Sequence, residues 1–380
     1  MTLRTAIRPL LATTLSPGTR PFWALLERGR DGSGLAPGIT AVVAARNEAY
    51  TIGFSLRSLI GFADQIVCID NGSTDDTLAE MRRFQEEHNA DVDIDVVSMA
   101  GALLGECREA GLERTRRQWH LRWDADHVAV TTGPDSILEL RDKILADRRP
   151  RTVQLSRTNL HGDLCHTSRT SAVVDPGEPF LMRFGRGIRY REYGKFDAVR
   201  VPFHYLQTQA PGRHVFHLAG LKSDENLIHR FHYFAWREAV NREGGAGEPD
   251  LYMFDSFKKR RNLLLFGTNE PRSLKFRYQR QLSYHLTRFD TDRFGDYPKV
   301  LKDELSTRQR FEVVYRDGRP WLRVDHEDPE MLDYRPTPED LAWDPEAFLR
   351  RFLTEEECRL VGIDPPVASQ PKLQTDSPSG

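Results

Sequence analysis

The sequence has few cysteines and no long apolar run, and each absence excludes a class of protein. Its 380 residues include only 4 cysteines, at positions 68, 107, 165 and 358. They form no CxxC pair, so neither a disulfide framework nor a zinc knuckle is expected, and the spacing favours a reducing, cytoplasmic compartment. The longest stretch without a charged residue, residues 32–45, is shorter than the ~20 apolar residues of a membrane-spanning helix. No membrane span is therefore expected.

An excess of charge of one sign is also missing. Lys and Arg number 54 against 56 Asp and Glu, which gives a net charge of -2. This balance leaves no basic footprint, so nucleic acid is not an expected partner. Apolar residues make up 39% of the chain, enough for a globular core and too many for global disorder.

Short strand-like segments alternate with helical patterns through the first 150 residues. Four apolar, partly β-branched segments are expected to be buried strands: residues 39–45, 65–70, 94–99 and 119–123. Helical spacing of apolar residues lies between and after them, at about 50–60, 74–84, 103–116 and 134–146. The alternation predicts βαβ units and a largely parallel sheet flanked by helices. The sequence has no GxGxxG and no GxxxxGK[ST] motif, so dinucleotide and P-loop sites are not expected.

The rest of the chain has a mixed pattern. Further strands are expected at 152–156, 180–184, 199–206 and 215–218, helices at 225–242 and 252–266, and a hairpin of 311–316 with 321–324 around an Asp-Gly turn. We therefore expect an N-terminal extension (1–38), an α/β domain (39–222), a mostly helical C-terminal region that carries the hairpin (223–364) and a disordered tail (365–380).

Two carboxylates follow the fourth strand. Asp124 and Asp126 are two residues apart, so in an extended segment they face the same side. They lie at the carboxyl end of a buried strand, where open α/β sheets bind ligands. Paired oxygen ligands there suit Mg²⁺ or Mn²⁺ with a diphosphate. The alternative is a solvated acidic turn.

Four segments in order resemble glycosyltransferase family 2, the inverting enzymes of the GT-A fold. They are AVVAARNE (41–48), IDNGSTDDT (69–77), CREAGLE (107–113) and the DAD of 124–126. The resemblance is close over about 38–133 and looser over about 180–217. The chain departs from the family's Ala-Arg-Asn at its third segment, where Glu109 replaces the asparagine. The implied fold is a Rossmann-like GT-A domain, and the implied activity is glycosyl transfer from a nucleotide-diphosphate sugar.

The resemblance also implies which residues bind the donor. Glu48 matches an acid near the ribose and base, Asp70 the carboxylate that reads the base edge, and Arg108 a residue near the diphosphate. A carboxylate only accepts hydrogen bonds, so Asp70 suits an imide N–H such as that of uracil, and a UDP-sugar is favoured. Asp70 could instead form an Asx-turn, and Arg108 could lie on a solvated helix face. The remaining donor-binding residues of the matched segments are Ala44, Asn71 and Asp124.

The looser part of the resemblance implies the catalytic acid position and the last metal ligand. Asp197 falls where the family's general base lies, Glu192 is the competitor, and the base could also be neither of them. An inverting transfer needs one carboxylate to deprotonate the acceptor while the metal neutralises the leaving diphosphate. His217 resembles the histidine that completes the metal site with Asp124 and Asp126, although a lone histidine near a strand is more often structural.

Three other functions remain as alternatives. The segment DADHV (124–128) also fits the DxDx[TV] motif of haloacid-dehalogenase phosphatases, but it lies on the fourth strand and has no later GDxxxD-type pair. A sugar nucleotidyltransferase would carry a Gly-rich, basic N-terminal signature that is absent. A non-catalytic GT-A-like binding protein is the third. The sequence does not identify the acceptor, which could be a glycan, a small molecule or a peptide, and a homo-oligomer is possible.

Overall fold

The structure of the protein is a computed structural model that describes part of the 380-residue chain. The described residues are 34–168, 173–175, 179–185, 187–193, 196–202, 204–223, 225–230, 232–233, 236, 251–266, 269–271, 274–275, 286–305, 309–316, 319–324 and 330–331. The chain divides into two units, residues 1–228 with 275–335 and residues 229–274 with 336–380. The expected N-terminal extension and C-terminal tail lie almost wholly outside the described residues.

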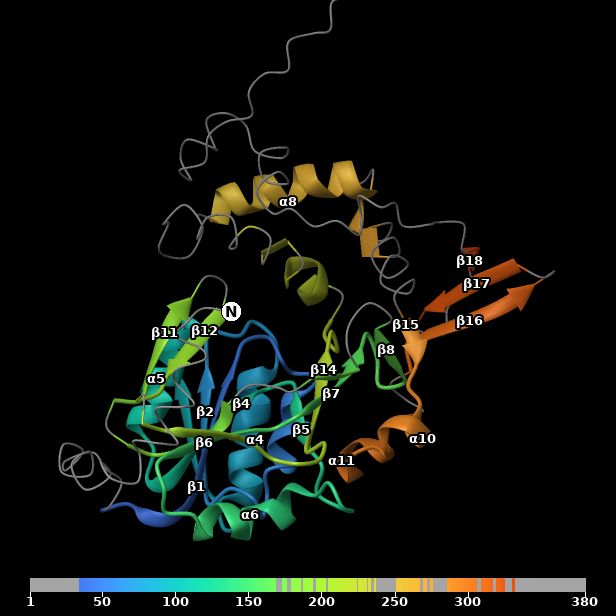
Figure 1. Ribbon diagram of the computed structural model, residues 1–380. Helices are drawn as coiled ribbons and strands as arrows, with labels where there is room; N and C mark the ends of the chain where they lie inside the picture. The colour runs from blue at the N-terminus through green and yellow to red at the C-terminus, as the bar shows by residue number, and fades with distance from the viewer. Residues whose placement is uncertain are drawn as a thin grey trace, which may run out of the picture. The chain divides into compact units, whose positions relative to one another are not determined.

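A seven-stranded mixed sheet forms the centre of the first unit, in the order β13-β6-β10-β4-β1-β2-β3. Its strands β1, β2, β4 and β6 are labelled in Figure 1. All pairings in it are parallel except those of β10 with β4 and with β6. The strands are β1 (Ala36–Ala45), β2 (Gln65–Asp70), β3 (Asp93–Ser98), β4 (Arg117–Asp124), β6 (Arg151–Gln154), β10 (Pro179–Arg183) and β13 (Leu206–Gln209). This confirms the expected mixed, largely parallel architecture.

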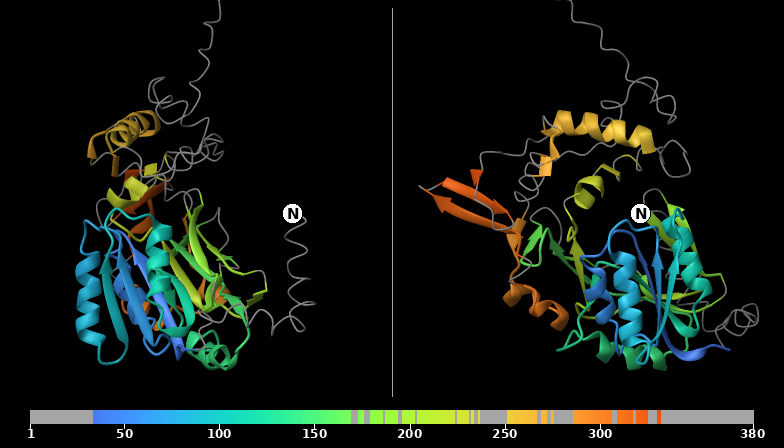
Figure 2. Two further views of the ribbon diagram at one scale, coloured as in Figure 1. Left: turned by 90° about the vertical axis from the view of Figure 1, so that its left-hand side faces the viewer. Right: turned by 180° about the vertical axis from the view of Figure 1, so that it is seen from behind.

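Helices cover both faces of the sheet, as the continuous apolar strand segments predict. Alternate residues of β1 pack into two different clusters. Ile39 and Val43 join α3 (Ile52–Arg57) and α4 (Thr77–His88) on one face. Val42 packs with Cys107 of α5 (Leu104–Glu113) on the other. Figure 2 shows helices on both sides of the strands.

One glycine explains the close approach of α5 to the sheet. Gly111 lies on the helix face against β1, and a Cβ added there would overlap the side chain of Val42. Only glycine allows this packing distance. The glycine of the CREAGLE segment therefore serves helix-to-sheet contact.

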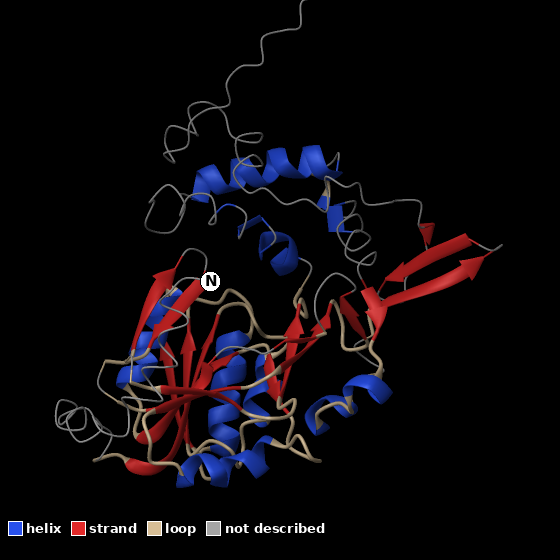
Figure 3. Cartoon of the chain, viewed as in Figure 1, coloured by secondary structure: helices blue, strands red, loops and turns tan. Residues whose placement is uncertain are grey.

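A second, four-stranded sheet stands beside the carboxyl end of β4. Its order is β5-β14-β7-β9. The strands are β5 (His127–Ala129), β7 (Arg157–His161), β9 (Val174–Asp175) and β14 (Val215–Ala219). Only β14 was expected from the sequence, because the other three are short and two of them are rich in polar residues. The strands of both sheets are red in Figure 3.

The smaller elements follow the sequence pattern in part. The hairpin β11 (Arg189–Tyr193) with β12 (Phe196–Arg200) and the hairpin β16 (Phe311–Arg316) with β17 (Arg319–Val324) are antiparallel, and the second was expected. The single strand expected at 199–206 is wrong. The chain turns there, with Tyr205 N–H donating to the Pro202 carbonyl at 3.1 Å, since proline interrupts a ladder. The remaining elements are α6 (Ile137–Ala146), β8 (His166–Ser168), β15 (Leu286–Arg288), α10 (Thr291–Phe294), α11 (Lys299–Lys302) and β18 (Glu330–Met331).

The second unit is described mainly through α8 (Leu251–Phe266), which matches the helix expected at 252–266. Trp236 packs edge-on against Phe257 with ring centroids 5.1 Å apart. His232 lies buried between Arg261 (2.8 Å) and Asn262 (2.7 Å). In the described part of the chain, no helix is long and apolar enough to cross a bilayer.

Candidate active site

Three neighbouring parallel strands end at one polar edge. In the register of β1 with its neighbours, Ala45 lies opposite Asp70 of β2 and Ala44 lies opposite Asp124 of β4. Parallel strands present their carboxyl ends at the same edge, which is the ligand edge of open α/β sheets. The structure therefore places Ala44, Asp70 and Asp124 together.

The loops after β1 and β2 are bonded to each other. Asn47 has a φ of 56°, a conformation that asparagine tolerates better than most residues. Its Oδ1 accepts from Thr74 N–H (2.8 Å), and its own N–H donates to Ser73 Oγ (3.0 Å). Glu48 N–H donates to Thr77 Oγ1 at 2.7 Å. The polar residues of the first two motifs thus join the loops after β1 and β2 by hydrogen bonds.

Asp70 forms the Asx-type turn that the sequence offered as the alternative to base recognition. The residue is 2% exposed, and its carboxylate accepts the N–H groups of Gly72 (3.2 Å) and Ser73 (3.2 Å). A carboxylate has about four acceptor positions, so these bonds do not exhaust it. Beside it, Asn71 Oδ1 is buried with no hydrogen-bond partner among the described residues, and a ligand could satisfy it.

A cluster of metal-ligand type lies where β4 passes into β5. Asp126, His127 and His217 each offer one ligand atom, and these atoms lie within 4.8 Å of one another. His217 Nε2 is 3.6 Å from Asp126 Oδ2. Nε2 of His127 is buried and has no hydrogen-bond partner among the described residues. One carboxylate, two imidazoles and a buried unsatisfied nitrogen fit a divalent ion such as Mn²⁺.

Asp124 adjoins this cluster and faces two ways. One oxygen pairs with Arg108, and the other lies 3.8 Å from Nε2 of His127. Arg108 is 1% exposed and donates to the carbonyls of Val42 (3.1 Å) and Trp123 (2.6 Å). Arg108 therefore does not lie on a solvated helix face, and it holds Asp124 against the strand ends. A contact of Arg108 with a diphosphate stays a prediction.

The polar groups around the two carboxylates keep them ionised. Burial raises the pKa of Asp126, but the polar groups beside it, His217 and Lys222 among them, outweigh burial and hold that pKa well below its ordinary value. Burial likewise raises the pKa of Asp124, and Arg108 more than reverses the effect. Burial lowers the pKa of His127 to about 3, so its imidazole is neutral at pH 7 and can bind a cation.

Asp197 lies in a buried ion-pair network. Its side chain is 2% exposed. Oδ1 accepts from Arg122 Nη2 at 3.0 Å, and Oδ2 lies 3.7 Å from Arg108 Nε. Glu192 stands directly opposite Asp197 in the β11–β12 register, but its side chain is outside the described part of the chain. Both remain predictions for the general base.

Glu109, which stands where the family has asparagine, contacts the β11–β12 hairpin. Its Oε2 accepts the N–H of Tyr190 at 2.8 Å, and Oε1 lies 3.5 Å from Arg189 Nε. The Tyr190 hydroxyl bonds to His120 Nε2 at 2.9 Å. The glutamate thus ties α5 to the hairpin that carries Asp197.

Glu48 forms an ion pair with Lys222, a residue that the sequence analysis did not single out. Lys222 is 5% exposed and Glu48 Oε2 also accepts from Thr51 Oγ1 at 3.3 Å. Lys222 follows His217 by five residues. β14 and the loop after it therefore bring His217 beside Asp126 and Lys222 beside Glu48, at the same edge of the sheet. His127 was not among the expected metal ligands either. The one feature of the sequence that points to it is its position directly after the DAD segment.

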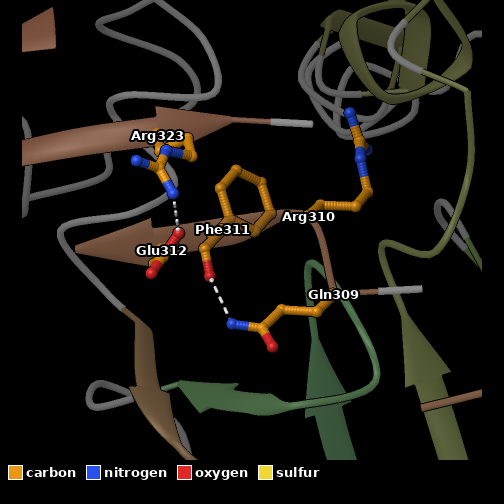
Figure 4. Close-up of a pocket in the computed structure, with 5 residues that line it drawn as sticks. All are labelled: Gln309, Arg310, Phe311, Glu312 and Arg323. Atoms are coloured by element: carbon orange, nitrogen blue, oxygen red, sulfur yellow. Dashed lines mark hydrogen bonds and ion pairs between the residues drawn. The ribbon is translucent and has the colours of Figure 1, made fainter. Parts of the chain in front are cut away.

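A small pocket at the base of the β16–β17 hairpin contains none of these residues. Gln309, Arg310, Phe311, Glu312 and Arg323 line it, and Arg323 bonds to Glu312 at 2.8 Å (Figure 4). No carboxylate pair or metal-ligand cluster forms part of its lining. The strand-end site is therefore the stronger candidate.

Comparison with known proteins supports this choice. Residues 40–148 match the family described as Glycosyl transferase family 2, and the match spans the strands, both interlocked loops, Arg108 and the DAD segment. A comparison of the sequence with curated proteins gives no match.

The solved structures that match the chain resemble it only distantly. S. aureus TarS 1–349 in complex with UDP-GlcNAc is 13% identical and covers 77% of this chain and 99% of its own, with a TM-score of 0.34. The mannosyltransferase PcManGT from Pyrobaculum calidifontis, in complex with GDP-Man and Mn²⁺, is 14% identical and covers 73% and 86%, with a TM-score of 0.36. Both TM-scores lie below 0.5, so these structures carry no argument about the function of this chain.

Proposed function

We propose that this chain transfers a sugar from a nucleotide-diphosphate donor by a metal-dependent reaction that inverts the anomeric carbon. The match of residues 40–148 to Glycosyl transferase family 2 supports this proposal. The observation that carries the metal dependence is the cluster of Asp126, His127 and His217, with ligand atoms within 4.8 Å of one another. It lies at the strand edge that also holds Asp70 and Asp124.

The residues that would hold the metal are Asp126, His127 and His217, with Asp124 beside them. A divalent ion there supplies Lewis-acid stabilisation of the leaving diphosphate. Two imidazoles in the donor set favour Mn²⁺ over Mg²⁺, which prefers oxygen ligands. Arg108 fixes Asp124, so the carboxylates meet the donor in a preset orientation.

The nucleoside would lie over the interlocked loops. The buried, unpartnered Oδ1 of Asn71 and the carboxylate of Asp70 offer acceptors to a base edge, which favours the imide N–H of uracil and hence a UDP-sugar. Glu48 would accept hydrogen bonds from the ribose hydroxyls. The acceptor substrate would be a glycan, a small molecule or a peptide.

The acceptor hydroxyl must lose its proton as it attacks the anomeric carbon, and Asp197 or Glu192 would take that proton. Asp197 would have to turn from Arg122 toward the acceptor to do so, whereas Glu192 sits at the paired position of the neighbouring strand. We also propose a reducing, cytoplasmic setting, supported by the few, widely spaced cysteines of the sequence.

The test of the metal-dependent function is Asp126→Ala. It should abolish sugar transfer or donor hydrolysis, and it should remove the Mn²⁺-dependent thermal stabilisation by UDP-sugars while the protein stays folded. Asp91→Ala, at a side chain that is 63% exposed, is the matched control and should behave as wild type. Full activity of Asp126→Ala in EDTA would exclude the metal role. Nucleotide binding by wild type without hydrolysis or transfer would favour a binding protein.

A further inference from the structure

His217 occupies the middle of a row that crosses three strands. β14 runs parallel to β7 and antiparallel to β5, and the registers place His217 opposite Asn159 on one side and His127 on the other. Side chains at directly paired positions share one face of a sheet. Accordingly, Nδ1 of His217 lies 2.9 Å from Oδ1 of Asn159.

The orientation of the Asn159 amide is determined by its other partner. Nδ2 of Asn159 donates to Asp175 Oδ2 at 3.0 Å. Asp175 in turn accepts from Arg157 Nε and Nη2, both at 3.1 Å. A carboxylate paired with an arginine is ionised and only accepts hydrogen bonds. The amide nitrogen must therefore face Asp175, and the amide oxygen must face His217.

This orientation decides which nitrogen of His217 carries the proton. An amide oxygen cannot donate, so Nδ1 of His217 must be the donor in the 2.9 Å bond. In the neutral ring Nε2 then has a lone pair. That atom is the one 3.6 Å from Asp126 Oδ2, a separation too long for a direct hydrogen bond and suited to two atoms that face one cation.

We propose that Asn159, held by Asp175 and Arg157, is a positioning residue that sets the Nδ1–H tautomer of His217 and so presents Nε2 to the divalent ion. Outer partners of this kind typically contribute 10–100-fold to metal affinity, because they fix the ring and its tautomer. The bound ion rests on the proposed function, whereas the tautomer is a property of the metal-free protein.

The experiment uses full-length, metal-free protein labelled with ¹⁵N-histidine. Long-range ¹H–¹⁵N spectra report the protonated nitrogen of each ring, and His217→Gln identifies the His217 signals. We expect a protonated Nδ1 in wild type, because the amide oxygen of Asn159 accepts from it. In Asn159→Leu the Nε2–H tautomer should appear. Asn89→Leu, at an exposed helix end, is the control and should leave the spectrum of His217 unchanged.

Mn²⁺ titrations followed by electron paramagnetic resonance give the second readout, with no turnover involved. Asn159→Leu should weaken Mn²⁺ binding ~10–100-fold. A wild-type Nε2–H tautomer, or an unchanged Nδ1–H tautomer in Asn159→Leu, overturns the inference. If Asn159→Leu does not fold, the wild-type spectrum still decides it. If the tautomers follow the expectation but wild type binds no Mn²⁺, the metal-dependent function fails and the role of Asn159 in setting the tautomer stands.

Discussion

Arg108 on α5 and Asp124 at the end of β4 form an ion pair in which the arginine is almost completely buried. The same guanidinium donates to backbone carbonyls of β1 and β4, at Val42 and Trp123. It is therefore bonded to two of the three strands whose ends form the candidate site, β1 and β4. An arginine in this position fixes the first carboxylate of the DAD segment and has little freedom to follow a substrate.

Arg108→Met tests that role. Removing one partner of a buried ion pair leaves an uncompensated charge and typically costs ~3–5 kcal/mol of unfolding free energy, so urea denaturation should show a large loss of stability. Arg114→Met, at the exposed C-terminal end of the same helix, should change stability by less than ~0.5 kcal/mol. Unchanged stability together with a loss of donor affinity would instead mean that Arg108 contacts the diphosphate.

Asp197→Asn addresses the general base. If Asp197 takes the acceptor proton, kcat should fall by ~10²–10⁴ with donor affinity nearly constant, because basicity is used in the transition state. The variant should also lose ~1–3 kcal/mol of unfolding free energy, since Arg122 loses its charged partner. Glu192→Gln is the comparison. Loss of kcat in Glu192→Gln alone would transfer the role to Glu192, and full kcat in both would place the base elsewhere.

Lys222→Met should have opposite effects on the two ligands of the site. Loss of this buried cation beside Glu48 and Asp126 makes the site more negative, so the affinity for Mn²⁺ alone should stay equal or rise. The affinity for UDP in the presence of Mn²⁺ should fall by ~10-fold, which corresponds to ~1.4 kcal/mol. Calorimetry measures both, and Lys222→Arg should retain UDP binding. A parallel fall in both affinities would indicate a damaged fold.

His120 predicts an acid-sensitive fold. Burial, followed by the nearby charges of Arg108 and Arg122, lowers the pKa of His120 to about 3 from an ordinary 6.5. Between these values the unfolded chain binds a proton that the folded protein does not, so stability is full above pH 6.5 and falls as the pH drops toward 3.

His120→Gln should therefore flatten the dependence of unfolding free energy on pH by ~1.4 kcal/mol per pH unit between pH 4 and 6, the value for one proton. Urea denaturation at several pH values measures the slope. His127 and His232, whose pKa values are also lowered to about 3, should continue to contribute in the variant. An identical slope in wild type and variant would mean that His120 is protonated in the folded protein.

Local sequence determined the sheet and the edge at which the site lies. The apolar runs at 39–45, 65–70 and 119–123 predict strands buried on both faces, and such strands pair in parallel with helices between them. Parallel pairing then brings their carboxyl ends together, so the common position of Ala44, Asp70 and Asp124 follows from the pattern alone. The order of the motifs was enough to indicate the family that residues 40–148 match.

Only the tertiary structure decided the partners of the charged residues. Arg122 reaches Asp197 across 75 positions, and Asn159 reaches His217 across 58. No periodicity encodes such pairs, because they depend on how the second sheet and the β11–β12 hairpin pack against β4. The family resemblance implied a donor-binding role for Arg108 and a base role for Asp197, and only the fold shows that the two buried side chains are neighbours. The sequence also offered no reason to select His127, Lys222 and Asn159. Their contacts with the site form only because strands far apart in the chain lie side by side.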